Sequence, residues 1–366
     1  MKKITYSQVG DNYQTKDPIN KLFQSTALKT SGNLKKSGFN EVLSSRGESC
    51  FVWKQGNIYM AHVLECLGTK NLIADEMRKI TGKTYYDVIA QDTVATFIND
   101  LSTSGAKPLV VHAYWGVEDN SFLQDEERTK DFVNGWTNAC QIAGTTWGGG
   151  ETATSKGIIE KGTINLAGSC VGIIKSEKRL LMEKKLQQGD RILLIKSNGV
   201  NANGISLTRA LARKLPKGYA TKLTSGKYYG ETLLTKSNIY AKLIQDLLDA
   251  KLNLHYITNI TGHGMRKIMR SKRNFTYVVE KIFEPQEIFQ FIQKYANLDD
   301  NEMYQTYNMG QDYAIFLPAK DVKKALRIIK NNNFEGLDAG YIKSGKRKVI
   351  IEPKNITFEG ETLDLR

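Results

Sequence analysis

The chain has 366 residues, of which 40% are hydrophobic and 25% charged, a composition typical of globular proteins and long enough for two cores. It contains no run of about 18 apolar residues and no N-terminal secretion signal, so we expect a cytoplasmic protein rather than a membrane or secreted one. The net charge of +14 is compatible with binding either nucleic acid or small anions. Because the basic residues are spread along the chain and no nucleic-acid-binding motif accompanies them, we favour small anionic ligands.

The four cysteines (Cys50, Cys66, Cys140 and Cys170) are scattered along the chain, and no two of them form a Cys-x-x-Cys pair. Only four histidines accompany them. We therefore expect reduced, mostly buried thiols and no zinc site.

The first part of the chain predicts a flexible arm followed by a hairpin. Residues 1–36 are polar and read as a mobile N-terminal arm, which includes the segment 6–10 as a candidate lid. Residues 50–53 and 58–64 predict two strands joined by a turn at 54–57. The second strand runs into Gly68-Thr69-Lys70, where a lysine beside a glycine suits phosphate contact, an exposed lysine at a helix start being the alternative.

Residues 91–101 predict a helix with two opposite faces. Its apolar face carries Val94, Phe97, Ile98 and Leu101, and its polar face carries Asp92, Thr96, Asn99 and Asp100. Because this helix has no lysine or arginine to pair with the acids, the polar face is predicted to bind a ligand, and a solvated surface is the alternative. Gly105 and Pro108 should end the helix and lead directly into a strand over 109–115.

A glycine run follows two further helical stretches, at 118–128 and 132–143. The consecutive glycines at 148–150 allow backbone N–H groups to converge on a phosphate, and Glu151 lies where it could bind a cation. A flexible turn is the alternative for this run. The apolar stretch 164–174 then predicts a strand.

The second half of the chain predicts a separate domain. A charged connection at 175–190 precedes a buried strand at 191–195, a glycine-containing loop at 197–207, and later a strand at 314–318 and a helix at 322–331. We therefore expect domains at 37–175 and 186–352, between the arm of residues 1–36 and a tail of residues 353–366.

Several of these motifs together resemble the aminoimidazole ribonucleotide synthetase superfamily, and most closely its cyclo-ligases. Residues 100–108 match its Asp-x4-Gly-Ala-x-Pro signature, and 149–153 match Gly-Gly-Glu-Thr-Ala. Residues 65–70 resemble Asp-Gly-Val-Gly-Thr-Lys with Glu65 in place of the aspartate. Residues 199–207 resemble Gly-x-His-Ser-Asn-Gly-x-Ser-Leu with Asn201 in place of the histidine, and 302–310 resemble Glu-Met-Tyr-x-Thr-Phe-Asn-x-Gly.

The resemblance implies a two-domain α/β fold whose N-terminal strands form a β-barrel across a homodimer. It implies ATP-dependent cyclisation of formylglycinamidine ribonucleotide in purine biosynthesis, with ATP and Mg²⁺, and with a monovalent cation as a further candidate cofactor. No Gly-x4-Gly-Lys-Ser/Thr sequence occurs, so ATP would be held through metal-bound carboxylates rather than by a Walker loop.

The resemblance also assigns residue roles. The metal ligands would be Glu65, Asp92, Asp100 and Glu151, and the catalytic residues Asp92, Asn201 and Lys70. ATP and its phosphates would contact Gly68, Thr69, Lys70, Asn99, Gly149, Gly150 and Thr152. The substrate would contact Gly199, Asn203, Gly204, Thr261, His263 and Asn308.

Two other functions stay open at this point. Asparagine cannot act as an acid or base near neutral pH, so Asn201 leaves room for a catalytically silent nucleotide-binding paralogue. Another ATP-dependent enzyme of the same superfamily is the second alternative, although the motif at 302–310 argues against it.

Overall fold

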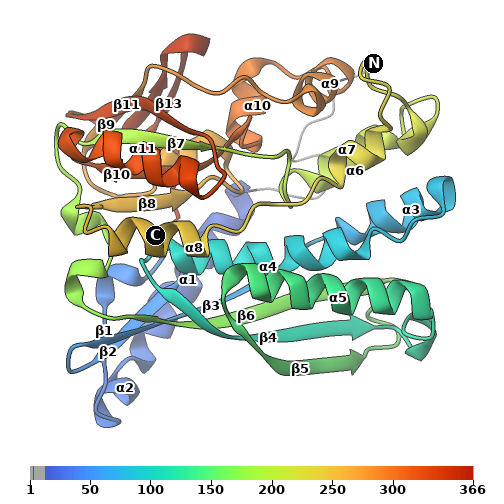
Figure 1. The fold of residues 1–366 in the computed structure, drawn as a ribbon, viewed down its shortest axis with the longest axis horizontal. Coiled ribbons are helices and arrows are strands. Elements are labelled where there is room, and N and C mark those ends of the chain that lie inside the picture. The colour runs from blue at the N-terminus through green and yellow to red at the C-terminus, as the bar shows by residue number, and fades with distance from the viewer. Residues whose placement is uncertain (1–2, 4–12, 366) are drawn as a thin grey trace.

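The computed structural model describes residue 3 and residues 13–365, and these form two α/β units. The N-terminal unit contains a six-stranded sheet, and the C-terminal unit a seven-stranded sheet. Figure 1 shows helices of both units lying between the two sheets. The two-domain α/β architecture expected from the sequence is confirmed.

The N-terminal sheet has the strand order β1-β2-β3-β6-β4-β5. Its strands are β1 (Asn40–Glu41), β2 (Phe51–Gln55), β3 (Ile58–Cys66), β4 (Lys107–Val117), β5 (Thr146–Thr154) and β6 (Ile164–Ile174). β4 and β5 run parallel, and the other neighbours are antiparallel. The predicted hairpin is present as β2 and β3, whereas the glycine run expected as a loop forms the edge strand β5.

One face of this sheet is covered by helices and the other is open. The helices of the unit are α3 (Asn71–Thr81), α4 (Tyr86–Ser102) and α5 (Glu126–Ala143). A Cβ atom at Gly168 of β6 would come within 2.4 Å of Phe97, so glycine is what allows α4 to lie directly on the sheet. Gly105 ends the α4 region with φ +85°, as predicted. On the open face Leu64 of β3 is 68% exposed.

The C-terminal sheet has the order β13-β12-β9-β11-β7-β10-β8. Its strands are β7 (Arg191–Lys196), β8 (Tyr256–Asn259), β9 (Phe275–Val279), β10 (Gln311–Leu317), β11 (Gly336–Ser344), β12 (Lys348–Ile351) and β13 (Ile356–Glu359). The segment expected as a tail after residue 352 therefore contributes β13, which pairs with β12 and belongs to the sheet.

Both faces of the C-terminal sheet are buried. Alternate residues of β10 enter two cores, because Ala314 and Phe316 join the main hydrophobic cluster while Tyr313 and Ile315 join a second cluster. The α-helices of the unit are α6 (Ile205–Ala212), α7 (Tyr229–Leu233), α8 (Ala241–Asp249), α9 (Glu287–Ala296), α10 (Asp300–Thr306) and α11 (Val322–Asn331). α8 and α11 contribute to the second cluster.

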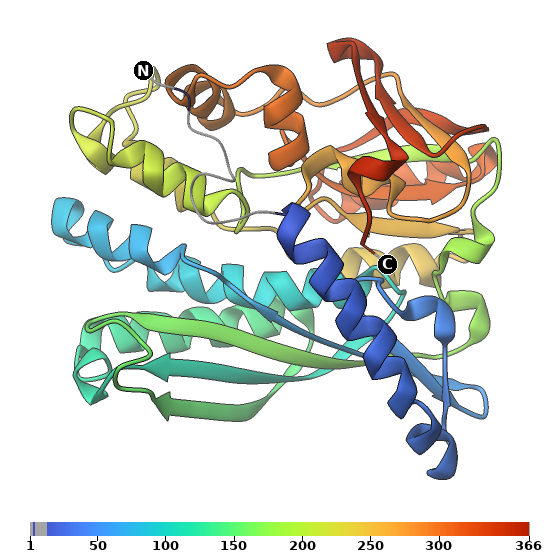
Figure 2. The ribbon, with the colours of Figure 1, turned by 180° about the vertical axis from the view of Figure 1, so that it is seen from behind.

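The N-terminal segment is helical where a flexible arm was expected. It forms α1 (Tyr13–Ala27) and α2 (Gly32–Lys36), and Figure 2 shows α1 lying across both units. Lys21 of α1 pairs with Asp364, and Gln24 donates to the carbonyl of Leu365 at 3.2 Å. The candidate lid at residues 6–10 lies outside the described residues.

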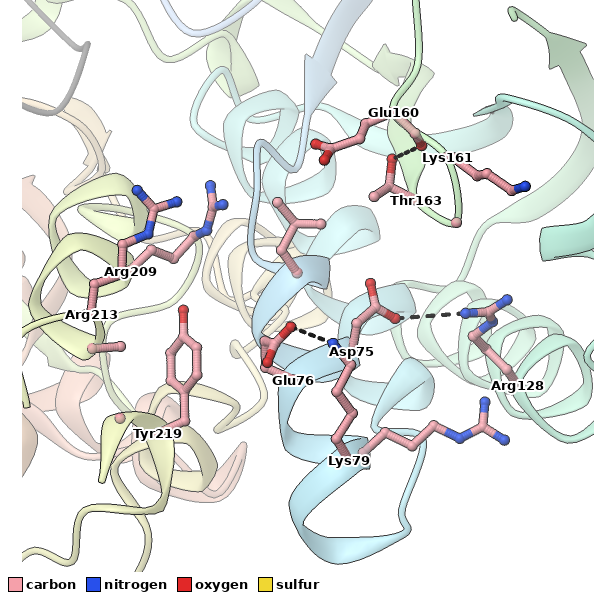
Figure 3. A pocket seen from close by; sticks show the side chains of 15 residues that line it. Asp75, Glu76, Lys79, Arg128, Glu160, Lys161, Thr163, Arg209, Arg213 and Tyr219 are labelled. Carbon is pink, nitrogen blue, oxygen red and sulfur yellow. Dashed lines mark hydrogen bonds and ion pairs between the residues drawn. The ribbon is translucent and has the colours of Figure 1, made fainter. Parts of the chain in front are cut away.

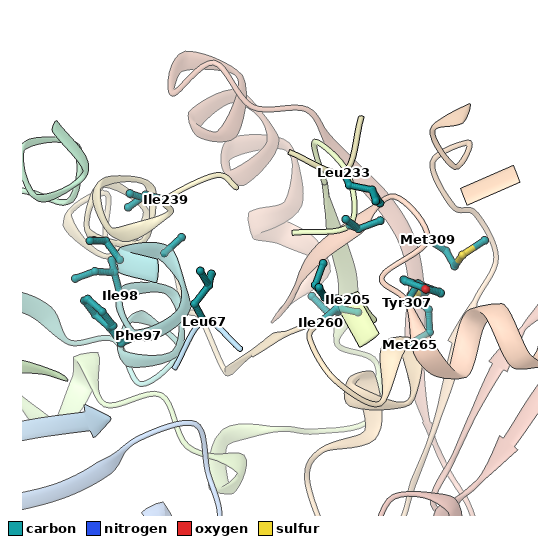
Figure 4. Packing of buried hydrophobic residues seen from close by; sticks show 14 of the residues in the cluster. Leu67, Phe97, Ile98, Ile205, Leu233, Ile239, Ile260, Met265, Tyr307 and Met309 are labelled. Carbon is teal, nitrogen blue, oxygen red and sulfur yellow. The ribbon is translucent and has the colours of Figure 1, made fainter. Parts of the chain in front are cut away.

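The two units share one hydrophobic cluster at their junction (Figure 4). Leu67 and Ile98 come from the N-terminal unit, and Ile205, Ile239 and Ile260 come from the C-terminal unit. Burial of apolar side chains from both units stabilises their association. The polar residues considered next lie around this junction.

Candidate active site at the junction of the two units

Lys70 and Asp92 form a buried ion pair at the junction. Both side chains are fully buried. The Lys70 ammonium also donates to the carbonyl of Asn201 at 2.7 Å and to that of Thr235 at 3.4 Å, and both carbonyls belong to the C-terminal unit. The Asp92 carboxylate accepts the backbone N–H of Ser237 at 2.7 Å. The two predicted catalytic residues thus pair with each other, and both side chains lie in the protein interior.

The polar face of α4 contacts the C-terminal unit along the segment 235–240. The Asn99 side chain donates to the carbonyl of Asn238 at 2.8 Å and accepts the N–H of Tyr240 at 3.0 Å. Gln91 donates to the carbonyl of Ser237 at 2.8 Å. Asn99, expected at the ATP phosphates, therefore satisfies backbone groups of the other unit. The polar face of α4 therefore connects the two units and does not face solvent.

Asn201 belongs to a buried polar network in the C-terminal unit. Its amide donates to Asp312 at 2.7 Å, and Asn308 donates to the same carboxylate at 3.2 Å and to the carbonyl of Gly199 at 2.9 Å. The Tyr240 hydroxyl donates to the second Asp312 oxygen at 2.6 Å. Burial raises the pKa of Asp312 to about 6 in spite of these donors. The structure therefore brings Asn201, Asn308 and Gly199, all chosen as site residues from the sequence, into one network.

Glu65 and Asp100 lie near one another at the end of β3. Burial raises the pKa of Glu65 to about 7, and the neighbouring Asp100 carboxylate adds to this shift. Asn259 donates to Asp100 at 2.8 Å. Burial lowers the pKa of Lys267 to about 7, and Asp100 and Glu65 oppose that shift, so the lysine lies within their electrostatic reach. Two carboxylates and one buried lysine thus influence one another electrostatically near the junction.

The remaining predicted metal ligand, Glu151, is separated from this pair. Sheet register connects Glu151 to Tyr114, Tyr114 to Ala167, and Ala167 to Cys66, so Glu151 lies three strands from the end of β3. Three steps between strands span about 14 Å. Among the described residues no group of three or more histidine, cysteine or acidic residues is placed to hold a metal ion. The four expected metal ligands are therefore not assembled within one chain.

The predicted phosphate-binding glycines lie at two separate places. Gly68 is exposed and Thr69 half-buried at the beginning of α3, whereas Gly149, Gly150 and Thr152 are exposed on the edge strand β5. The pairing of β4 with β5 shifts register at this glycine run, and Gly149 has φ +109°. The run is thus an irregular edge strand, with a bulge, rather than a loop.

The predicted substrate residues cluster at loops of the C-terminal unit. Gly204 has φ +69°, and a Cβ there would lie 2.1 Å from the Tyr307 ring, so the position requires glycine. Asn203 lies in the same loop, and the backbone of Thr261 accepts the N–H of Gly264 at 3.0 Å. His263 has φ +71°, and its Nε2 lies 3.3 Å from a carboxylate oxygen of Asp17 in α1.

Three residues of the site escaped the sequence analysis. Asp312 is the common acceptor of the Asn201 network, the charge of Lys267 acts on Glu65 and Asp100, and Asn259 donates to Asp100. Asp312 could have been noticed as a lone acid opening an otherwise apolar strand. Lys267 belongs to the basic segment 266–273, and the charge pattern of that segment did not indicate that one of its lysines is buried. Asn259 carried no distinguishing signal.

Family models match nearly the whole of both units. Residues 47–174 match the N-terminal domain of AIR synthase related proteins, and residues 187–352 match the C-terminal domain. The chain belongs to the AIR synthase related family. The resemblance seen in the sequence motifs is thereby confirmed.

Relatives within the AIR synthase related family carry a common name. A phosphoribosylformylglycinamidine cyclo-ligase of Clostridium novyi is 32% identical over 78% of this chain and 82% of the relative. One from Methanosarcina acetivorans is 33% identical over 80% of this chain and 84% of its own length. One from Methanococcus maripaludis is 26% identical over 96% and 98%.

Solved structures of lower identity share the fold. The thiamine-monophosphate kinase of Stenotrophomonas maltophilia has a TM-score of 0.58 at 15% identity, over 83% of this chain and 88% of that chain. The hydrogenase maturation protein HypE has a TM-score of 0.58 at 15% identity, over 86% and 92%. In the described part of the chain, no helix combines the length and the apolar character needed to cross a membrane.

Proposed function

We propose that this chain cyclises formylglycinamidine ribonucleotide to aminoimidazole ribonucleotide at the expense of ATP, a step of purine biosynthesis. The observation that carries the proposal is the similarity to relatives named as cyclo-ligases over 78 to 96% of the chain. Motif residues of both units, among them Lys70, Asp92 and Asn201, also meet at one junction, where a nucleotide substrate and ATP could be brought together. The cytoplasmic location expected from the sequence stays a prediction.

The proposed reaction needs positioning more than it needs a nucleophilic side chain. ATP transfers its terminal phosphoryl group to the amide oxygen of the substrate, the amidine-side nitrogen attacks that carbon, and phosphate leaves as the ring closes. An amide oxygen becomes a good leaving group only when it is phosphorylated. A site rich in Asn, Asp and Gly suits this chemistry, because orientation and charge stabilisation account for most phosphoryl-transfer catalysis.

The structure suggests different duties for the predicted catalytic residues. Lys70 and Asp92 are positioning residues in this proposal, because their contacts fix the backbone at Asn201 and Ser237. Gly68 and Thr69, which stay accessible, are the phosphate-contacting part of the motif. Asn201 is held by Asp312 and positions the loop at 199–204.

Mg²⁺ fits part of the predicted ligand set. The raised pKa of Glu65, caused by burial and by Asp100, shows two carboxylates whose repulsion a cation would relieve. Mg²⁺ commonly uses one or two carboxylates together with substrate phosphates, so Glu65 and Asp100 suffice as protein ligands. Mg²⁺ bound there would neutralise charge on the ATP phosphates.

A homodimer remains part of the proposal. The open face of the N-terminal sheet presents Leu64 and Leu109, 68% and 37% exposed, and Ile58 is 51% exposed. Exposed apolar side chains on one sheet face mark an association surface. Leu64→Glu should convert a dimer to a monomer in sedimentation velocity, whereas a wild-type chain that is monomeric and active at micromolar concentration would end this model.

A silent nucleotide-binding paralogue is the second candidate function. Two observations favour it. The Asn201 amide is already hydrogen-bonded to Asp312, and Lys267 already supplies positive charge near Glu65 and Asp100, where a metal ion would otherwise do so. The test is an assay of ADP and aminoimidazole ribonucleotide formation with purified protein, together with rescue of a purine-requiring strain that lacks its own cyclo-ligase. Product and rescue support the enzyme, whereas ATP binding without either supports the paralogue.

A further inference from the structure

A cavity of about 830 Å³ lies between the two units, outside the residues of the candidate active site. It is lined by α3, by the segment before β6, and by α6 with the following turn at 218–219. Figure 3 shows basic side chains reaching it from several of these elements. The basic lining residues are Arg78, Lys79, Arg128, Lys161, Arg209 and Arg213.

Three of the basic residues are neutralised by nearby acids. Lys79 pairs with Glu76 at 2.6 Å, and Arg128 lies 3.7 Å from Asp75. Arg78 pairs with two carboxylates at the beginning of α5. These three cations therefore belong to the wall of the cavity.

The other three basic residues have no such neutralisation. In the part of the chain that the structure describes, Arg209, Arg213 and Lys161 form no ion pair with a carboxylate. Among the described acidic residues that line the cavity, Glu160, which precedes Lys161, also forms no ion pair. Figure 3 shows the Glu160 carboxylate turned toward the two arginines and the Lys161 ammonium turned away from them. The excess of positive charge on the wall of the cavity is therefore that of Arg209 and Arg213, a charge arrangement that suits an anion.

Arg209 and Arg213 are the centre of this excess. Arg209 belongs to α6, and Arg213 follows as the C-cap of that helix one turn later, so two like charges are neighbours, an arrangement that an anion between them would relieve. Figure 3 shows their side chains extending in the same direction beside the hydroxyl of Tyr219. Paired guanidinium groups with an adjacent hydroxyl match the acceptor oxygens of a phosphate ester.

We propose that this cavity binds a phosphate-bearing small molecule through Arg209 and Arg213. The arginines belong to the C-terminal unit, whereas α3 and the segment before β6, which line the other sides of the cavity, belong to the N-terminal unit. Such a phosphate could be that of the ribonucleotide substrate or that of a separate ligand. The binding itself does not depend on the proposed catalytic activity.

Ribose 5-phosphate is the probe that tests this proposal, titrated calorimetrically into the full-length chain. Arg209→Gln with Arg213→Gln should raise its Kd at least about ten-fold, because charge-assisted hydrogen bonds to the phosphate are lost. The matched control is Lys323→Gln with Arg327→Gln on α11, which removes the same charge at the same spacing from exposed positions away from the cavity. The control should leave the Kd unchanged.

Two further measurements complete the test. Arg213→Gln, a single change at an exposed position, should weaken binding about three-fold and covers the case in which the double arginine variant does not fold. Loss of ribose 5-phosphate binding when formylglycinamidine ribonucleotide is saturating would identify the substrate's own phosphate, and undiminished binding would identify a separate ligand. No binding by the wild type at millimolar concentration, or equal weakening in the control, would overturn the proposal. Because binding is read without turnover, a failed activity assay leaves this test intact.

Discussion

Asp92→Asn is the substitution that best separates structural from metal-binding roles at the junction. Asparagine keeps an oxygen that can accept the N–H of Ser237, so the change removes mainly the negative charge beside Lys70. The Lys70 ammonium would then be fully buried with only two carbonyl oxygens as partners. We expect a large loss of stability because a buried cation loses its counter-ion.

The expected loss is about 3–5 kcal/mol, the range for removing one partner of a buried ion pair. If both units unfold together, the unfolding entropy of a chain this long converts that loss into a melting temperature lower by about 4–6 °C. Urea denaturation and calorimetry of the wild type and variant would measure both quantities. Lys70→Met should cost a similar amount, and the double variant Lys70→Met with Asp92→Asn should recover part of the loss, giving a coupling energy.

The reasoning would be refuted by a specific pattern. If Asp92→Asn keeps the wild-type stability within about 1 kcal/mol and loses Mg²⁺-dependent turnover, Asp92 serves a metal ion and not Lys70. Asp87→Asn in the same helix is a control, since Asp87 pairs with Lys236 at a partly exposed position where ion pairs contribute little.

Three further predictions concern residues around the same junction. Asn99→Ala should lower the unfolding free energy by about 1–3 kcal/mol, measured in urea, because two backbone groups of the C-terminal unit lose their partner. Gly204→Ala should weaken substrate binding and lower the melting temperature through collision with Tyr307, whereas Gly226→Ala, which also has positive φ but open space, should be milder in both measurements. Burial lowers the pKa of His263, so the unfolded chain binds its proton first as pH falls below about 6.5. The wild type should therefore lose up to about 1.4 kcal/mol per pH unit between pH 6 and 4 relative to His263→Gln, and parallel pH profiles of the two proteins would contradict this.

The sequence predicted local structure well wherever periodicity and turn residues act within one segment. The helix expected at 91–101 lies within α4 and ends one residue before it, the strand at 164–174 has the bounds of β6, and the helix at 322–331 has those of α11. Each of these follows from the spacing of apolar residues, which neighbours in the chain determine. The tail after residue 352 was misjudged because β13 is stabilised by pairing with β12 and not by its own pattern.

The polar contacts of the site could be predicted only in part. The pattern correctly singled out Asp92 and Asn99 as unlike an ordinary solvated face, but their partners at 235–240 lie more than 130 residues further along the chain. Periodicity within one helix contains no information about which distant segment will cover it. For the same reason the pairing of Lys70 with Asp92 was not foreseen, although both residues were chosen as site residues.

The buried pair also bears on the order in which the chain is completed during synthesis. Every strand of the N-terminal sheet is present once residue 174 has left the ribosome, but the carbonyls of Asn201 and Thr235 and the N–H of Ser237 emerge later. Until then no residue of the C-terminal unit can cover Lys70 and Asp92, whose side chains are fully buried in the complete chain. Docking of the C-terminal unit therefore removes water from a charged pair. The free-energy cost of this desolvation is offset only when the incoming backbone groups form their hydrogen bonds with good geometry. Complete burial of the pair is thus reached only when the backbone groups of the C-terminal unit are in place.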